Sequence, residues 1–357
     1  MGIFDKVLRS DESVFKVEIA LNYDYQPKLI PYREKQQFKI VNCIKPLFNN
    51  MNGRNLIITG LPGIGKTVAT KHVLAELEEE TTEIIPIYIN CWQKQTTYKI
   101  FVDICNQLEF KFIQNKRTEE LLEIIKKILN KKAAVFVFDE IDKTDDPNFL
   151  YSLIEEIHYK SIICITNYKS WVSTLDKRIM SRLMPETIEF LPYNKVETEG
   201  ILNERIRIAF VPEVWDKKAL SIIVEKTSEL KDIRTGLYLL KEAGLCANDR
   251  SSKKIEEIDV KKALEKIPDF KIKNTNELEN DLQIILEIVK KNSGSKIGEL
   301  YKIYESNEGK GSYKTFQRKI AKLKESKFIK TKKIIGGEEG STTIVSYDTA
   351  TKQLSDF

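Results

Sequence analysis

The clearest chemical signal in this sequence is a glycine-rich stretch, residues 60–67, which reads GLPGIGKT and fits the pattern G-x-x-x-x-G-K-[ST]. An apolar run precedes it and a helical pattern follows it, which is the context that a phosphate-binding loop needs. The glycines let backbone N–H groups close around phosphate oxygens, and the helix N-terminus adds partial positive charge. Lys66 is expected to reach the β- and γ-phosphates, and the Thr67 hydroxyl to hold Mg²⁺. The predicted loop contacts are Gly60, Gly63, Ile64, Gly65, Lys66 and Thr67.

An apolar run that ends in two acidic residues is the second signal. Residues 133–138 are all Ala, Val or Phe, which is typical of a strand buried on both faces of a parallel sheet. Asp139 follows directly and is expected to bind Mg²⁺, either directly or through water. Glu140 is expected to orient and polarise the water that attacks the γ-phosphate. Downstream of a phosphate loop, this pair predicts hydrolysis of a nucleoside triphosphate.

Two other polar residues stand where they could act on the same phosphates. Asn167 ends a further predicted buried strand, residues 161–167, and could help to place the attacking water; an ordinary Asn turn is the alternative. Arg234 begins a helix in the second half of the chain and could reach back to the γ-phosphate. That contact would couple this part of the chain to the state of the nucleotide. The alternative for Arg234 is a solvated arginine at a helix start.

The bulk composition excludes several classes of protein. The chain of 357 residues is 41% hydrophobic and 31% charged, which is typical of a globular protein. No apolar run approaches the ~20 residues of a membrane helix, so no membrane partner is expected. The N-terminus lacks a basic and then apolar signal region, which predicts a cytoplasmic location. The five cysteines are scattered and there are only two histidines, so buried free thiols are favoured over a structural zinc site.

The order of strand and helix patterns predicts the fold class. Residues 1–192 comprise an N-terminal segment and strands that alternate with helices, which predicts an α/β nucleotide-binding domain with a parallel, doubly wound sheet. Residues 193–272 carry four helical patterns and no strand signal, which predicts a helical lid. Residues 273–357 show three amphipathic helices and a hairpin, which predicts a winged-helix domain.

The C-terminal domain concentrates positive charge. Residues 310–333 hold ten lysines and arginines and one acidic residue, a net charge of +9, whereas the whole chain carries +5. Such a stretch on a helix and wing is the footprint of contact with the phosphates of duplex DNA, and Gln317 and Arg318 could read base edges. A solvated lysine-rich face and a protein-docking winged helix are the alternatives. The candidate DNA contacts are Lys314, Gln317, Arg318, Lys322, Lys330, Lys332 and Lys333.

In this order, the motifs resemble those of the archaeal replication initiators of the origin-recognition and cell-division-cycle type, a branch of the AAA+ ATPases. The resemblance runs from about Tyr25 to Tyr347. The matching motifs are a Y-x-P…P-x-R-E segment at residues 25–34, Walker A at 60–67, Walker B at 139–140, sensor 1 at Asn167, an L-D-x-R…S-R box at 175–182, a Pro-Tyr lid entry at 192–193 and sensor 2 at Arg234. The N-terminal segment lies near the adenine in that family; from its spacing alone, a strap over the sheet edge is equally consistent.

The resemblance assigns roles to further residues. It implies that Arg182 acts on ATP held by a neighbouring subunit, with Arg178 as the other candidate, and that Tyr193 and Arg205 contact the nucleotide. The sequence departs from the family at Lys231, which replaces the usual glycine three residues before Arg234, so a differently shaped helix start is expected. Residues 114–116, where the family can carry an extra DNA-contacting helix, are short and weakly basic here, and no such contact is expected.

The implied function is an ATP-dependent, origin-binding initiator of DNA replication. ATP or ADP with Mg²⁺ would be the cofactors, and slow ATP hydrolysis would act as a switch. The expected partners are duplex DNA at origin elements, the replicative helicase and a second initiator copy on DNA, in a nucleoid-associated location. A DNA-binding regulator of a plasmid or mobile element is the alternative. A clamp-loader-like ATPase subunit is disfavoured, because clamp loaders end in a helical collar rather than a basic winged helix.

Overall fold

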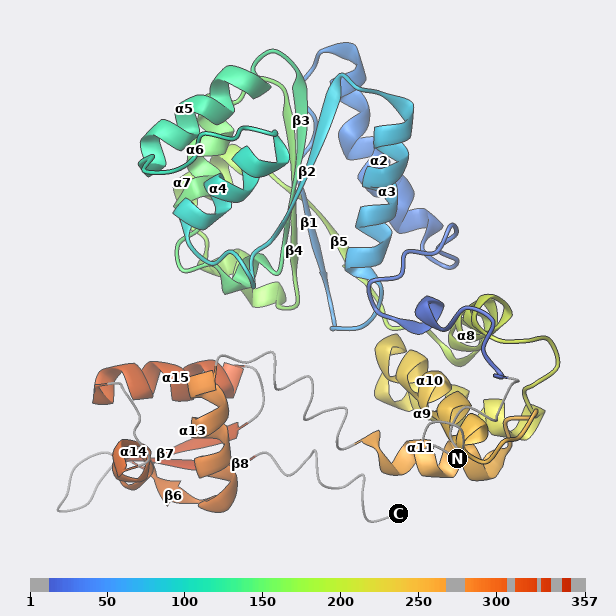
Figure 1. The fold of residues 1–357 in the computed structure, drawn as a ribbon. Helices are drawn as coiled ribbons and strands as arrows, with labels where there is room; N and C mark the ends of the chain where they lie inside the picture. Colours follow the sequence, from blue (N-terminus) through green and yellow to red (C-terminus); the bar gives the residue numbers. More distant parts are fainter. Residues whose placement is uncertain (1–12, 268–279, 307–311, 326–328, 335–341, 348–357) are drawn as a thin grey trace. The chain divides into compact units, whose positions relative to one another are not determined.

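The computed structural model describes residues 13–267, 280–306, 312–325, 329–334 and 342–347 (Figure 1). The chain forms two compact units, Met1–Leu264 and Glu265–Phe357. The predicted boundary at residues 272 and 273 lies outside the described residues, and the predicted division of the first unit at residue 192 stays a prediction.

The first unit is built on a parallel sheet of five strands in the order β2-β3-β4-β1-β5. The strands are β1 (Leu56–Gly60), β2 (Ile84–Asn90), β3 (Ala133–Asp139), β4 (Lys160–Thr166) and β5 (Glu186–Phe190). Because β4 lies between β3 and β1, the carboxyl ends of all three strands meet at one edge of the sheet. Binding sites of doubly wound sheets lie at that edge. The predicted α/β fold class is confirmed.

Helices cover both faces of this sheet (Figure 1). The alternation along β3 shows why: Phe136 and Phe138 pack into one apolar cluster, whereas Val135 and Val137 pack into the other. On the valine side lie α2 (Glu34–Ile44) and α3 (Lys66–Glu80). On the phenylalanine side lie α4 (Thr97–Gln107), α5 (Thr118–Leu129), α6 (Asn148–Glu156) and α7 (Lys177–Leu183). Short 3₁₀ turns join these elements at η2 (Lys45–Asn49), η3 (Ile141–Lys143) and η4 (Lys169–Thr174).

Four helices after the sheet form the lid, as predicted. They are α8 (Lys195–Ala209), α9 (Lys217–Leu230), α10 (Ile233–Asp249) and α11 (Glu257–Glu265). An N-terminal segment that the sequence left unassigned packs against them and includes η1 (Glu18–Leu21). The Phe15 ring lies 4.9 Å from the Phe210 ring, and the Lys16 N–H donates to the carbonyl of Ala209. A Cβ at Gly244 would lie 2.4 Å from Phe15, so this close packing requires glycine.

Residues 23–33, here called the strap, connect this lid-bound segment to α2 in the sheet layer (Figure 1). The chain therefore links the sheet and the lid twice, once through the strap and once through residues 191–194 between β5 and α8.

The second unit is a winged helix, as predicted. Its elements are α13 (Asn280–Lys291), β6 (Ser295–Lys296), α14 (Ile297–Ser306), α15 (Tyr313–Glu325), β7 (Ile329–Ile334) and β8 (Thr342–Tyr347). The strands form an antiparallel sheet in the order β6-β8-β7. Phe316, Ile320 and Leu323 are buried, which is the stripe expected for α15. The expected hairpin turn at residues 336–340 lies outside the described residues.

Two further findings bear on the bulk composition. All five cysteines are free and buried, which confirms the expectation of buried thiols. Among the helices that the structure describes, none combines the length and apolar character of a membrane span.

The turn between α9 and α10 corrects the expectation for Lys231. This residue ends α9 in the left-handed conformation, with a φ of 54°, which is the conformation that glycine favours. Asp232 then caps α10 by accepting from the N–H of Arg234 at 2.9 Å. The lysine adopts the backbone shape of a glycine, so the start of α10 is ordinary.

Lys231→Gly should therefore leave the fold unchanged and raise the free energy of unfolding by about 0.5–1 kcal/mol. The left-handed conformation costs a residue with a Cβ about 1–2 kcal/mol, and the greater freedom of glycine in the unfolded chain offsets part of that gain. Denaturant unfolding followed by circular dichroism measures the change. Lys231→Ala is the matched control and should be neutral; an equal gain from alanine would contradict the explanation.

An ion pair between the buried carboxylate of Asp259 and the exposed guanidinium of Arg250 joins α10 to α11. Asp259 is fully buried, and its two oxygens accept from Nε and Nη2 of Arg250, both at 2.8 Å. Asp259 also accepts from the N–H of Glu256 at 2.9 Å. Removing the guanidinium would leave a buried carboxylate without its charged partner.

Arg250→Ala should lower the free energy of opening of α10 and α11 by about 3 kcal/mol, with a smaller loss for Arg250→Lys. Amide hydrogen exchange of these helices measures it. Arg207→Ala removes an exposed pair with Glu204 and serves as the control, with an expected loss of about 0.5 kcal/mol. Equal losses in the two alanine variants would contradict a stabilising role for the Arg250–Asp259 pair.

Candidate functional site

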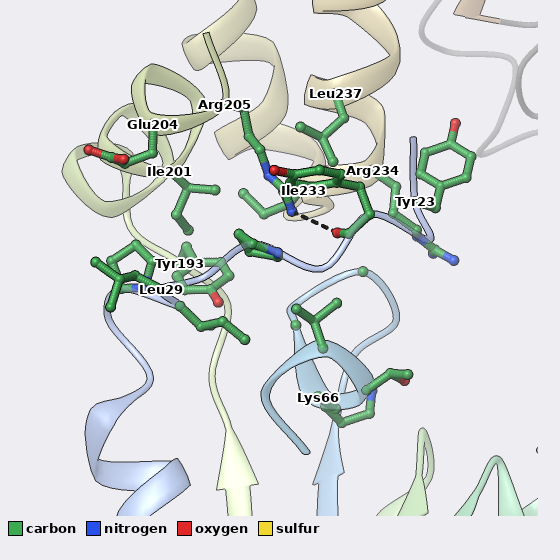
Figure 2. A pocket seen from close by; sticks show the side chains of 18 of the residues that line it. Tyr23, Leu29, Lys66, Tyr193, Ile201, Glu204, Arg205, Ile233, Arg234 and Leu237 are labelled. Carbon is green, nitrogen blue, oxygen red and sulfur yellow. Dashed lines mark hydrogen bonds between the residues drawn. The ribbon is translucent and has the colours of Figure 1, made fainter. Parts of the chain in front are cut away.

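A cavity of about 600 Å³ lies between the strap, the phosphate loop and the lid (Figure 2). This is the size of a small-molecule site. One part of its lining is apolar and includes Leu29 and Ile30 of the strap and Ile201 and Leu237 of the lid. The polar part gathers the candidate residues Lys66, Thr67, Asp139, Glu140, Asn167 and Arg234. Tertiary structure therefore brings the predicted phosphate and metal contacts together.

The phosphate loop has the backbone that its glycines permit. Gly60, Gly63 and Gly65 have φ values of 151°, 72° and 89°. A Cβ on Gly65 would lie 2.8 Å from the Tyr193 hydroxyl, and one on Gly60 would lie 2.5 Å from the carbonyl of Phe190. Ile64 is buried in the core and anchors the loop. The loop is thus a tight cradle that ends at the N-terminus of α3.

Lys66 lies inside this cradle. Its Nζ donates to the carbonyls of Gly60 at 2.8 Å and Leu61 at 2.7 Å, and to Oδ1 of Asn167 at 2.8 Å. Burial lowers the pKa of Lys66 to about 8, although the charge of Asp139 opposes that shift. The contact with Asn167 puts that amide beside the phosphate loop, where the sequence-based role requires it.

Thr67 and the acidic pair lie side by side. The Thr67 hydroxyl donates to Oδ2 of the buried Asp139 at 2.5 Å, and Oδ1 of Asp139 accepts from the N–H of Glu140 at 2.9 Å. Burial, together with the charges of Asp139 and Asp142, raises the pKa of Glu140 to about 7. The hydroxyl and carboxylate oxygens are the hard ligands that Mg²⁺ prefers, so these residues fit the expected cation.

The lid contacts the phosphate loop directly at the start of α10. The N–H of Ile233 donates to the carbonyl of Gly63 at 3.1 Å. Arg234 lines the cavity (Figure 2). Its Nε and Nη2 donate to Asp232 at 3.1 and 2.9 Å. A contact between Arg234 and a ligand stays a prediction, but the geometry links α10 to the loop.

Arg205 and Tyr193 also line the cavity (Figure 2). Arg205 donates to the carbonyls of Ala20 at 3.1 Å and Tyr25 at 3.4 Å, so it holds the lid-bound segment and the start of the strap. The guanidinium of Arg33 lies over the ring of Tyr193, with Cζ of Arg33 3.8 Å from the ring centroid. Direct contact of either residue with a nucleotide stays a prediction.

Arg182 lies outside this cavity. It is half-exposed on α7, where Nη1 donates to Oε1 of Glu155 at 2.5 Å and the guanidinium lies 5.5 Å from the Tyr151 ring. Arg178 is exposed and pairs with Asp176. The expectation that Arg182 acts on a neighbouring chain stays a prediction.

The candidate DNA contacts lie in the winged helix. Lys314, Gln317 and Arg318 are exposed on α15, and Lys330 and Lys332 are exposed on β7. The side chains of Lys322 and Lys333 lie outside the described residues.

Sequence reasoning missed two side chains that organise the site. Arg33 is buried, and its Nη2 donates to the carbonyls of Ile64 at 3.0 Å and Leu191 at 2.7 Å, which ties the end of the strap to the phosphate loop. Tyr88 on β2 donates its hydroxyl to Asp139 at 2.7 Å. Arg33 belongs to the Y-x-P…P-x-R-E segment, but its position in the sequence does not indicate that it would contact the phosphate loop. No sequence pattern indicated a role for Tyr88.

Comparisons with known proteins agree with this architecture. Residues 49–166 match the family model described as an AAA domain, and residues 199–265 match the Cdc6 AAA+ ATPase-type lid domain. The chain is 32% identical to the ORC1-type DNA replication protein 1 of Sulfurisphaera tokodaii over 343 residues, which cover 90% of this chain and 86% of that protein.

Two solved structures share the fold. One is the Aeropyrum pernix ORC1 protein in complex with DNA, with 24% identity, 97% of each chain covered and a TM-score of 0.79. The other is the Aeropyrum pernix ORC2 protein as ADPNP–ADP complexes, with 16% identity, 96% of this chain and 97% of that chain covered, and a TM-score of 0.64. With the matched lid and a likeness to a curated relative that spans nine-tenths of this chain, these findings show that the chain belongs to the family of ORC1-type DNA replication proteins.

Proposed function

We propose that this protein is an ATP-dependent initiator of DNA replication that binds duplex DNA at origin elements. The observation that carries the proposal is the cavity, in which a phosphate loop, an acidic pair and the start of a lid helix converge in a chain of the ORC1-type family. The family is one of AAA-type, nucleotide-binding proteins, and ATP or ADP with Mg²⁺ would be its ligands here.

The lining suggests how ATP would lie. The base would occupy the apolar part between the strap and the lid, and the phosphates would reach the loop, where Lys66 and backbone N–H groups bind them. Thr67 and Asp139 would hold Mg²⁺, which neutralises charge on the β- and γ-phosphates when it is bound. The Aeropyrum pernix ORC2 structure with ADPNP and ADP supports this choice of ligand by analogy.

Hydrolysis would be slow and would serve as a switch. Glu140 would orient the attacking water and accept its proton, with Asn167 beside Lys66 as a second orienting group. Arg182 lies away from the cavity of its own chain, so a second copy would have to supply this arginine. Arginines supplied by a partner can change turnover by ~10³–10⁵-fold, so a low rate in the isolated protein agrees with the proposal.

The lid is the element that would report the nucleotide state. Asp232, Ile233 and Arg234 begin α10, and Ile233 already contacts the loop carbonyl of Gly63. A γ-phosphate would offer Arg234 a partner in place of Asp232. The angle of the lid would then differ between ATP and ADP, and with it the grip on DNA or on the replicative helicase.

The winged helix would bind DNA in the nucleoid. Its helix α15 and strand β7 present exposed basic side chains, which suit phosphate contacts, and the Aeropyrum pernix ORC1 structure contains DNA. Gln317 and Arg318 would face base edges in the major groove. The winged helix also argues against a clamp-loader-like subunit. Specific binding to an origin element would exclude the remaining alternative, a DNA-binding regulator of a plasmid or mobile element.

Lys66→Ala should abolish nucleotide binding, because the phosphate loop loses the side chain that is expected to reach the β- and γ-phosphates. Glu140→Gln should retain ATP affinity and lose hydrolysis. Fluorescent-nucleotide titration and phosphate release measure the two properties. Lys99→Ala, at an exposed position of α4, is the control. Unchanged ATP affinity in Lys66→Ala would remove the site assignment, and retained turnover in Glu140→Gln would remove the role of that carboxylate.

Origin binding is tested with DNA fragments that flank the gene of this protein, across a salt series and with ATP or ADP. A discrete footprint that survives competitor DNA is expected. Lys330→Ala with Lys332→Ala should reduce the slope of log affinity against log salt by about 2, since each phosphate contact contributes about 0.9. Lys35→Ala with Lys99→Ala is the matched double control. Weak, sequence-blind binding would contradict the initiator, and an unchanged slope would exclude the wing as the contact.

A further inference from the structure

Strand β2 brings an unassigned tyrosine to the candidate cation site. In the parallel pairing of β2 with β3, Asn90 lies opposite Asp139 and Tyr88 lies opposite Val137. Residues two apart along a strand share a face, so the Tyr88 side chain can reach along the sheet to the carboxylate. Its hydroxyl donates to Oδ2 of Asp139 at 2.7 Å. The same oxygen accepts from the Thr67 hydroxyl at 2.5 Å.

Contacts from two helices hold Tyr88, one at its ring and one at its backbone. Lys71 follows Thr67 by one helical turn on α3, and its Nζ lies 4.4 Å from the centroid of the Tyr88 ring. At the end of α4, the side chain of Gln107 accepts from the backbone N–H of Tyr88 at 3.1 Å and donates to the backbone carbonyl of Tyr88 at 2.9 Å. The ring is therefore placed between α3 and β3 before any ligand binds.

Tyr88 does not belong to the described lining of the 600 Å³ cavity. It lines a separate, smaller pocket of about 240 Å³ together with Gln26, Lys71 and Gln107. Its hydroxyl can act on a bound nucleotide only through Asp139, so its role is one of positioning.

The hydrogen bonds of Asp139 show what this positioning achieves. Oδ1 accepts from the Glu140 N–H, and Oδ2 accepts from both Thr67 and Tyr88. The χ2 torsion of aspartate is intrinsically broad, so the orientation of the carboxylate depends on these donors. Of the two donors to Oδ2, Thr67 is itself expected to bind the cation, whereas Tyr88 lies outside the nucleotide cavity and is not expected to touch the cation or the nucleotide. Tyr88 is thus the donor that can hold Oδ2 in place when Thr67 engages the cation.

We propose that Tyr88 positions Asp139, and through it the Thr67 hydroxyl, for binding of the Mg²⁺–nucleotide complex. This inference rests on the proposed nucleotide site and deepens it. Groups that orient the ligands of a metal commonly change metal affinity by 10–100-fold when they are removed. Tyr88→Phe removes only the hydroxyl and keeps the ring under Lys71.

The experiment titrates Mg²⁺ into the full-length protein with a fluorescent ATP analogue, and repeats the nucleotide titration in EDTA. In Tyr88→Phe, half-saturation should require roughly tenfold more Mg²⁺. The affinity in EDTA and the thermal midpoint without nucleotide should match those of the wild type. Tyr159→Phe, which removes the hydroxyl of an exposed tyrosine just before β4, is the control and should resemble the wild type in all three measurements.

The outcomes separate this inference from the function it rests on. A wild-type protein that binds no nucleotide would overturn the proposed function and the role of Tyr88 together. Mg²⁺-dependent binding by the wild type with the same Mg²⁺ midpoint in Tyr88→Phe would overturn the role of Tyr88 alone. An equal loss of affinity with and without Mg²⁺, or a lowered thermal midpoint, would mean that the hydroxyl serves the fold and would also overturn the inference.

Discussion

Three buried charged groups at the carboxyl edge of the sheet impose the constraint on which this structure depends. Lys66, Asp139 and Arg33 are each less than a tenth exposed. A buried charge is tolerated only where hydrogen bonds or an opposite charge replace the lost water. Each group obtains its partners from a different part of the chain, so satisfying the charges also fixes how the loop, the strands and the strap meet.

The partners of these charges explain the shape of the site. Lys66 donates to Asn167, and this hydrogen bond joins the end of β4 to the phosphate loop that follows β1. Asp139, at the end of β3, holds Thr67 on α3 and Tyr88 on β2. Arg33 donates to the carbonyl of Ile64 within the loop and to the carbonyl of Leu191, where the chain leaves the sheet for the lid. A ligand that replaces one of these partners therefore acts on several elements at once.

The double connection between sheet and lid extends this coupling. The strap is held at its lid end by Arg205, which binds the carbonyls of Ala20 and Tyr25, and at its sheet end by Arg33. Between these anchors it forms one wall of the cavity. The lid-bound segment before it is fixed by Phe15 against Phe210. Movement of the lid must therefore move a wall of the cavity, which gives the nucleotide a physical means to influence the lid.

The sequence by itself determined the elements and the chemical identity of the loop. The phosphate-loop pattern, the apolar run before Asp139, the four lid helices and the buried stripe of α15 are local signals, because helix and strand periods and glycine backbones depend on near neighbours in the chain. For the same reason the change to Lys231 was misjudged: sequence alone reports a lost glycine, whereas the folded turn holds lysine in the glycine-like conformation.

Only the tertiary structure decided which side chains serve one another. Tyr88 and Asp139 are 51 residues apart, and Arg33 and Leu191 are 158 apart. Their contacts depend on the strand order β2-β3-β4-β1-β5 and on the path of the strap, neither of which has a local pattern. Arg205 shows the same limit, since its spacing from Tyr193 gave no indication that its guanidinium binds the strap. The physical reason is that buried polar groups take whichever partner the packed chain brings within hydrogen-bond reach, and that choice is made in space.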